Sequence, residues 1–272
     1  MMKFSVLMSV YEKEKPEFLR ESLESILVNQ TMIPTEVVLV EDGPLNQSLY
    51  SILEEFKSRF SFFKTIALEK NSGLGIALNE GLKHCNYEWI ARMDSDDVAI
   101  KTRFEKQVNF IKQNPNIDIV GAEIDEFLNS TSEIVSHKNV PTQHDEILKM
   151  ARRRNPMCHM TVMFKKKSVE RAGGYQTLPY VEDYFLWVRM IATGSKLANI
   201  DETLVFARVG NGMFNRRGNR EQINSWTILN EFMLAQGIIT PLDVFINQIY
   251  IRVFVYMPTW IKKLMYGKIL RK

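Results

Sequence analysis

Short runs of aliphatic and β-branched residues recur along the first half of the chain, separated by stretches with helical periodicity. The runs that predict strands span residues 4–10, 36–41, 62–68, 88–94 and 117–123. Between the first two, Leu19, Leu23, Ile26 and Leu27 form the apolar stripe of a helix, and residues 49–60 repeat that pattern. This alternation indicates an α/β, Rossmann-like fold in which a mostly parallel sheet is covered by helices on both faces.

Polar residues follow three of these strands. Tyr11 follows the first, Asp42 the second, and the acidic stretch 94–97 ends the fourth. Ligands of such sheets bind outside the carboxyl ends of the strands, so we expect a ligand site here. After about residue 125 the alternation weakens, and residues 152–171 form a basic segment. We expect this second half to receive a second substrate.

Composition narrows the class of protein. The chain has 272 residues, of which 45% are hydrophobic and 25% charged, as in an ordinary globular protein. Its two cysteines, Cys85 and Cys158, cannot build a disulfide framework or a cysteine zinc site, so a reducing compartment, the cytosol, is expected. The apolar run 4–10 is interpreted as a strand rather than a secretory signal. No uncharged apolar stretch reaches the roughly 18 residues of a membrane-spanning helix.

Positive charge is concentrated at the C-terminus. Residues 244–272 carry six basic and no acidic side chains, which leaves 29 basic against 32 acidic side chains elsewhere. This distribution argues against a nucleic-acid binder. Aromatic residues alternate with the cations, which is typical of a segment in the interface of an anionic bilayer, with Trp260 at headgroup level and Phe254 and Leu264 buried. The alternative is a helix packed on the core.

The strongest local signal is the sequence Met93-Asp94-Ser95-Asp96-Asp97. Its carboxylates are hard oxygen ligands, suited to Mg²⁺ or Mn²⁺ shared with substrate phosphates. Packing them so closely costs repulsion that a bound cation relieves. A solvated acidic turn is the alternative, and Asp97 is either a further site residue or the N-cap of the next helix.

Five motifs together resemble family 2 glycosyltransferases, which have the GT-A fold. In chain order they are SVLMSVY (5–11), VLVEDG (38–43), NSGLGIALNEGL (71–82), MDSDD (93–97) and VEDY (181–184). The likeness covers residues 4–210 and is similar in particular to bacterial enzymes that build O-antigen, capsule and exopolysaccharide. It implies a metal-dependent enzyme that moves a sugar from a nucleotide-diphosphate donor to a glycan.

The resemblance assigns roles in donor binding. It makes Asp94 and Asp96 the carboxylates that hold Mg²⁺ or Mn²⁺ against the donor diphosphate. Asp42 matches the residue that accepts a hydrogen bond from the donor base, which favours a UDP-sugar, and Tyr11 lies where the family packs the nucleotide. The loop that begins at Asn71 enters a helix and suits an anionic donor.

Two of these motifs also have simpler interpretations. Residues 42–44 make a plain turn as readily as a donor contact. Gly73 and Gly75 serve equally well to shape a helix entry. A dinucleotide-binding fingerprint is not completed, because Leu78 occupies the third glycine position.

The late acidic motif supplies a candidate base. The resemblance makes Asp183 the group that takes the acceptor hydroxyl's proton on the face opposite the leaving group, and inversion follows from that geometry. Glu182 and Asp183 also suit the first turn of a helix. His159 resembles a family position that faces the active site, although a lone histidine is more often structural.

Three arginines follow where some family members carry a metal-binding histidine. Arg208, Arg216 and Arg217 are candidates to bind the diphosphate as bidentate cations. A solvated basic loop is the alternative interpretation.

We therefore expect a GT-A domain over residues 1–215, with a nucleotide-sugar half (1–125) and an acceptor half (126–215). Residues 216–272 are expected to form a helical region with a basic amphipathic tail. The expected enzyme is an inverting glycosyltransferase that acts on a lipid-linked glycan at the inner, cytoplasmic face of the membrane.

Two other functions share part of this pattern. A sugar-phosphate nucleotidyltransferase should carry a glycine-rich, lysine-containing phosphate loop near the first strand, yet residues 9–17 contain no glycine. A non-catalytic nucleotide-sugar binding protein would not need Asp183 in addition to the metal-binding pair.

Overall fold

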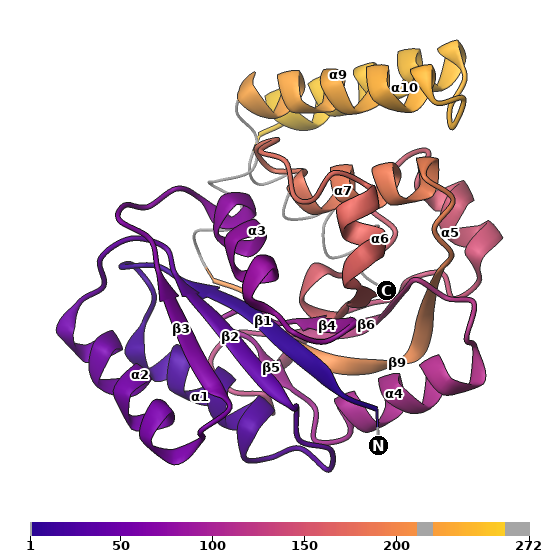
Figure 1. Cartoon of the computed structure of the whole chain (residues 1–272). Coiled ribbons are helices and arrows are strands. Elements are labelled where there is room, and N and C mark those ends of the chain that lie inside the picture. The colour runs from indigo at the N-terminus through magenta and orange to yellow at the C-terminus, as the bar shows by residue number, and fades with distance from the viewer. Residues whose placement is uncertain (1, 211–219, 259–272) are drawn as a thin grey trace.

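The computed structural model describes residues 2–210 and 220–258. Within them, nine strands form one sheet in the order β3-β2-β1-β4-β8-β6-β9-β5, and β7 pairs with β6 (Figure 1). The strands are β1 (Phe4–Val10), β2 (Glu36–Glu41), β3 (Phe63–Ala67), β4 (Trp89–Arg92), β5 (Val98–Ala99), β6 (Ile119–Phe127), β7 (Ile134–Lys138), β8 (Met163–Lys165) and β9 (Leu197–Arg208). The expected α/β fold is confirmed.

The consecutive parallel strands lie where strand and helix patterns alternate most regularly in the sequence. β3, β2, β1 and β4 are parallel neighbours, at nearly the expected positions. Beyond β4 the sheet becomes mixed, because the short β8 runs antiparallel between β4 and β6. The predicted strand at 117–123 is present as β6, but β8 separates it from the parallel group.

Helices cover both faces of the sheet (Figure 1). They are α1 (Pro16–Leu27), α2 (Gln47–Arg59), α3 (Leu74–His84), α4 (Arg103–Gln113), α5 (His144–Met150), α6 (Lys166–Arg171), α7 (Glu182–Ala192), α9 (Arg220–Ala235) and α10 (Pro241–Tyr256), with a 3₁₀ turn at His159–Thr161. One apolar cluster joins the sheet to α1, α2 and α4, and a second joins it to α3, α5, α6 and α7. The predicted stripe from Leu19 to Leu27 faces the first cluster and is buried.

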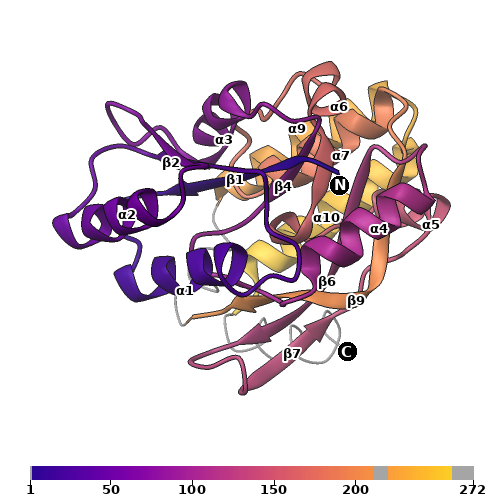
Figure 2. The ribbon, with the colours of Figure 1, turned by 60° about the horizontal axis from the view of Figure 1, so that its bottom comes forward.

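The α9–α10 hairpin forms a further layer over α7 (Figures 1 and 2). Tyr184 of α7 meets Trp226 of α9 edge to face at 5.9 Å, and Leu229 of α9 and Ile251 of α10 are buried in the same cluster. The described part of the expected C-terminal helical region is thus one layer of the fold. The expected boundary at residues 215/216 lies outside the described residues. No helix in residues 2–210 and 220–258 is long and apolar enough to cross a membrane.

Candidate active site

The carboxyl ends of four parallel strands bring the residues of the early motifs to one edge of the sheet. Asp94 lies just beyond β4, Tyr11 follows β1, Asp42 follows β2, and Asn71 lies in the segment after β3. Because these strands are consecutive neighbours, the four residues follow the same edge in that order.

Asp42 holds the loop that leads into α3. Its carboxylate, 4% exposed, accepts hydrogen bonds from the backbone N–H groups of Ser72 (2.7 Å) and Gly73 (3.0 Å). Gly43 has a φ of +85°, and a Cβ there would lie 2.5 Å from the Asn71 nitrogen, so only glycine fits this approach. Asp42 therefore has a structural role, and its contact with a donor base stays a prediction.

Asp94 is fixed by a buried arginine. The Arg92 guanidinium, at the end of β4, forms an ion pair with the Asp94 carboxylate. Ser22 of α1 donates a hydrogen bond to the Asp94 carbonyl at 2.7 Å. Arg92 is 1% exposed, and its Nε and Nη1 have no hydrogen-bond partner within the described chain. A buried guanidinium with unpaired N–H groups therefore lies against the acidic segment.

Arg208, at the end of β9, holds the same segment from the second half of the chain. Its backbone N–H donates to Asp97 Oδ1 (2.8 Å) and its Nε donates to the Asp96 carbonyl (3.0 Å). Its guanidinium also pairs with Glu21 and lies 3.9 Å from the centre of the Phe18 ring. These contacts hold the acidic segment in place, and Arg208 also lines the cavity described below. Its binding to a diphosphate stays a prediction.

Crowding in the acidic segment is visible in the pKa values of Asp96 and Asp97. Burial, with Asp94 and Glu14 nearby, raises the pKa of Asp96 to about 7. Burial and the charges of Asp94 and Asp96 raise the pKa of Asp97 well above its usual value. An added positive charge would favour the ionised form of both groups.

The carboxylate oxygens of the acidic segment fit a divalent cation that is shared with a ligand. Asp97 Oδ2 is buried without a hydrogen-bond partner among the described groups, and all the oxygens offered are hard ligands. Yet within residues 2–210 and 220–258 no three histidine, cysteine or acidic side chains are placed to hold a metal alone. Cations held by one or two carboxylates plus substrate phosphates need no such cage.

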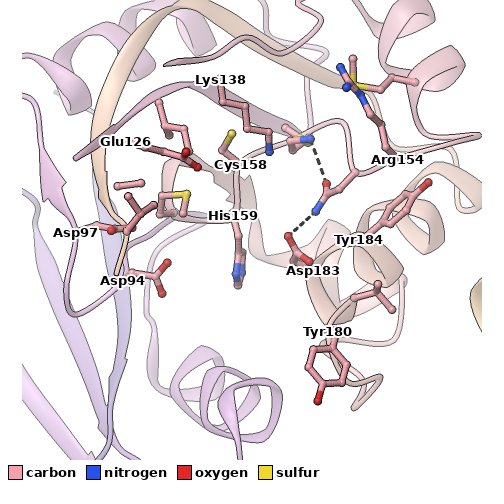
Figure 3. A pocket seen from close by; sticks show the side chains of 18 of the residues that line it. Asp94, Asp97, Glu126, Lys138, Arg154, Cys158, His159, Tyr180, Asp183 and Tyr184 are labelled. Atoms are coloured by element: carbon pink, nitrogen blue, oxygen red, sulfur yellow. Dashed lines mark hydrogen bonds between the residues drawn. The ribbon is translucent and has the colours of Figure 1, made fainter. Parts of the chain in front are cut away.

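A cavity of about 730 Å³ extends from the acidic segment to α7 (Figure 3). Figure 3 shows Asp94 and Asp97 on one side of it and Asp183 on another. It is also lined by Asp96 and by residues of the α9–α10 hairpin, namely Gln222, Trp226, Tyr250, Ile251 and Phe254. All three expected segments of the chain thus contribute to one site. Tyr11, Asp42 and Asn71 do not line this cavity.

Asp183 lies in the first turn of α7. Its Oδ2 accepts a hydrogen bond from Asn155 Nδ2 at 2.6 Å (Figure 3). Burial raises the pKa of Asp183, and the bonds from the Tyr184 backbone and Asn155, together with the charge of Lys138, oppose that rise. A carboxylate with a raised pKa is a stronger proton acceptor than an exposed aspartate.

Glu182 and His159 flank Asp183. Both line a smaller cavity of about 50 Å³ beside Asp183, and burial raises the pKa of Glu182. His159 Nε2 lies 2.9 Å from the Tyr175 hydroxyl, and burial, with the charge of Arg92, lowers the pKa of His159 well below its usual value. His159 is therefore a neutral, packed side chain that still reaches the site.

Sequence reasoning missed three residues of this site. Arg92, Lys138 and Asn155 have no local signal of function, because each meets its partners only in the folded chain. Arg216 and Arg217 lie outside the described residues.

Comparison with known proteins agrees with this geometry. Residues 5–173 match the family described as "Glycosyl transferase family 2". The chain is 41% identical to the amylovoran biosynthesis glycosyltransferase AmsE of Erwinia amylovora, over 85% of this chain and 86% of that one. It is 36% identical to an Escherichia coli UDP-Gal:alpha-D-GlcNAc-diphosphoundecaprenol beta-1,3-galactosyltransferase, over 99% and 97%.

Solved structures share the fold. Staphylococcus aureus TarS 1–349 in complex with UDP-GlcNAc superposes with a TM-score of 0.70 at 19% identity, covering 98% of this chain and 76% of that one. A Pyrobaculum calidifontis mannosyltransferase in complex with GDP-Man and Mn²⁺ gives 0.65 at 15% identity, over 97% and 74%.

Asn155→Ala should raise the pKa of Asp183 further. In the wild type the hydrogen bond from Asn155 Nδ2 favours the ionised carboxylate. Loss of this bond therefore shifts the ionisation of Asp183 to higher pH. The measurement is a carbon NMR titration of the Asp183 carboxyl. Asn139→Ala, which removes another amide from the cavity wall, is the control and should leave the titration unchanged. Equal titrations in both variants would contradict this role of Asn155.

Proposed function

The chain belongs to glycosyl transferase family 2, and we propose that it transfers a sugar from a UDP-sugar, with inversion, to a lipid-linked glycan in the synthesis of a surface polysaccharide. One observation carries this proposal. The acidic segment at Asp94 and the half-buried carboxylate of Asp183 lie on different walls of a single cavity. A displacement needs its leaving group and its base on opposite sides of the reacting carbon.

The first wall is proposed to hold the donor. Asp94, fixed by Arg92, and Asp96 would hold a divalent cation, and the exposed ring of Tyr11 would pack on the base beside Asp42. When bound, the cation would offset the negative charge that develops on the departing diphosphate. The Mn²⁺ in the mannosyltransferase structure supports such a site.

The second wall is proposed to hold the acceptor. Asp183 takes the proton of the acceptor hydroxyl while that oxygen bonds to the anomeric carbon, and the bond from this carbon to the diphosphate oxygen breaks. Asn155 orients the receiving carboxylate and keeps it ionised. The configuration at the anomeric carbon inverts because entry and departure occur on opposite faces.

The relatives support the choice of substrates. The Escherichia coli relative is named for a UDP-sugar donor and a diphosphoundecaprenol-linked acceptor, and the Erwinia relative for the biosynthesis of amylovoran. Both are similar to this chain over most of its length. TarS was solved with UDP-GlcNAc in the same fold.

A lipid-linked acceptor requires contact with a membrane, and α10 offers a surface for it. Leu242, Phe245, Ile249, Val253 and Tyr256 are spaced three or four residues apart and are exposed, three of them by about two thirds (66%, 64% and 67%). We assign this outward face of α10, rather than Phe254, to the lipid interface on the cytoplasmic side.

The other face of α10 belongs to the protein. Asn247, Ile251 and Val255 are buried, and Phe254, which we expected in the bilayer, lines the cavity. The six cations of residues 244–272 favour an anionic bilayer as the occupant of the outward face. Because α10 has one face on the cavity, a lipid-bound acceptor would have a short path from the bilayer to Asp183.

Asp183→Asn and Asp96→Asn should separate chemistry from donor binding. Asp183→Asn should lower the transfer rate about 10²-fold or more with donor affinity nearly intact, the scale of a lost general base. Asp96→Asn should weaken donor binding when Mn²⁺ is present and have little effect in EDTA. The measurements are UDP release and calorimetric donor binding, with exposed Asp201→Asn as control. Turnover by the wild type in excess EDTA would refute the role of Asp96. Transfer by Asp183→Asn at the wild-type rate would refute the role of Asp183.

Serine substitutions on the outward face should release the enzyme from lipid. Phe245→Ser with Val253→Ser should reduce co-flotation with anionic vesicles by about 10-fold or more, because two apolar side chains no longer leave water. The matched control, Val28→Ser with Ile33→Ser, removes two exposed aliphatic side chains elsewhere. Equal flotation of both double variants would contradict the assignment. A wild-type dimer that the first pair converts to a monomer would instead make this face an interface between copies.

A further inference from the structure

The basic segment of the second half is mostly used to hold the fold. Its members and their partners are Arg152 with the Ile238 carbonyl, Arg153 with Asp243, Lys165 with Asp118, Lys166 with the Cys85 carbonyl and Arg171 with Ser195. These contacts explain why cations are frequent in this stretch of sequence. They leave one arginine of the triplet 152–154 unexplained.

Arg154 lines the 730 Å³ cavity, and so does Lys138 at the end of β7. In the described part of the chain, neither side chain has a hydrogen bond or an ion pair. Arg154 is exposed and Lys138 is half-buried. Two cations without an ion pair in the described chain thus come from distant points of the sequence to one cavity, which Glu126 and Asp183 also line.

Both cations lie near Asp183. Figure 3 shows Lys138 beside Glu126 at the top of the cavity and Arg154 on the side of Asp183 away from Asp94. Lys138 is close enough for its charge to lower the pKa of Asp183. Arg154 directly precedes Asn155, whose amide bonds that base. Arg154 is therefore separated from the carboxylates proposed to hold the donor, and Lys138 lies close to the base.

We propose that Lys138 and Arg154 bind the diphosphate that links the acceptor glycan to its lipid. This inference rests on the proposed function and adds the recognition of a second diphosphate to it. The donor's diphosphate already has a site at Asp94 and Asp96. The acceptor's diphosphate diester carries about two negative charges, which two cations without ion pairs match, and a guanidinium binds phosphate oxygens in a bidentate manner.

This site also gives the acceptor an orientation. A diphosphate held at Lys138 and Arg154 would fix one end of the first sugar and leave its hydroxyl groups toward Asp183. Only a hydroxyl at the correct distance from the diphosphate would then reach the base. The two cations would thus select for a sugar next to the lipid diphosphate over the same sugar deeper in a glycan.

The test compares two acceptor forms in four proteins. The acceptors are undecyl diphosphate glycosides of N-acetylglucosamine, N-acetylgalactosamine, glucose and galactose, and the corresponding undecyl glycosides without phosphate. The proteins are wild type, Lys138→Gln, Arg154→Gln and Lys149→Gln, the last replacing an exposed cation of α5 that does not line the cavity. The quantity measured is kcat/KM for the diphosphate form divided by kcat/KM for the form without phosphate. The product is detected by mass spectrometry, with long incubation for slow acceptors. A ratio cancels any change in the reactivity of Asp183 that Lys138→Gln causes.

The wild type should prefer the diphosphate form by about 100-fold or more, and Lys149→Gln should retain that preference. Lys138→Gln and Arg154→Gln should each reduce it by about 10-fold, the effect of one charge-assisted contact. An unchanged ratio in both variants would overturn the assignment. So would a tenfold weaker calorimetric affinity for UDP in Mn²⁺ with the ratio unchanged, because the cations would then serve the donor. Transfer to neither acceptor form by the wild type would refute the proposed function itself, and the inference with it.

Discussion

Mutual repulsion of the carboxylates at the end of β4 is the constraint on which the rest of the site depends. Asp94, Asp96 and Asp97 are crowded and at least partly buried, and the raised pKa values of Asp96 and Asp97 show the cost. The ion pair with Arg92 offsets part of this repulsion, and a hydrogen bond from the Arg208 backbone holds the segment to β9. The acidic segment therefore cannot be held by the first half of the chain alone, since its last anchor is more than a hundred residues away.

This dependence joins the parts of the chain into one unit. β9 pairs with β6 and β5, and the hairpin of β6 and β7 carries Lys138 to the cavity. The α9–α10 layer then closes the cavity over α7 with Trp226 and Phe254. Donor and acceptor halves are useful names for the two walls. They are not separate bodies, because the same strands and the same charges support both.

Local pattern was sufficient for the elements and motifs of the first half. The stripe at Leu19 and the strand at residues 36–41 bury their own apolar side chains, so the period of the sequence predicts them. Contacts between distant segments could not be predicted in this way. β8 enters the sheet between β4 and β6, Asn155 meets Asp183, and Lys138 reaches the cavity only after the chain has folded. The contacts of Arg208 could not be predicted for the same reason, since Glu21 and Phe18, which contact its guanidinium, lie on α1.

The central claim is that leaving group and base act from opposite sides of one carbon. The stereochemistry of the product tests it most directly, by proton NMR of the anomeric coupling after transfer from an α-linked UDP-sugar of gluco or galacto configuration. Our account predicts a large coupling, that of a β linkage. A small coupling, showing a retained α linkage, would contradict single displacement and the role of Asp183 with it.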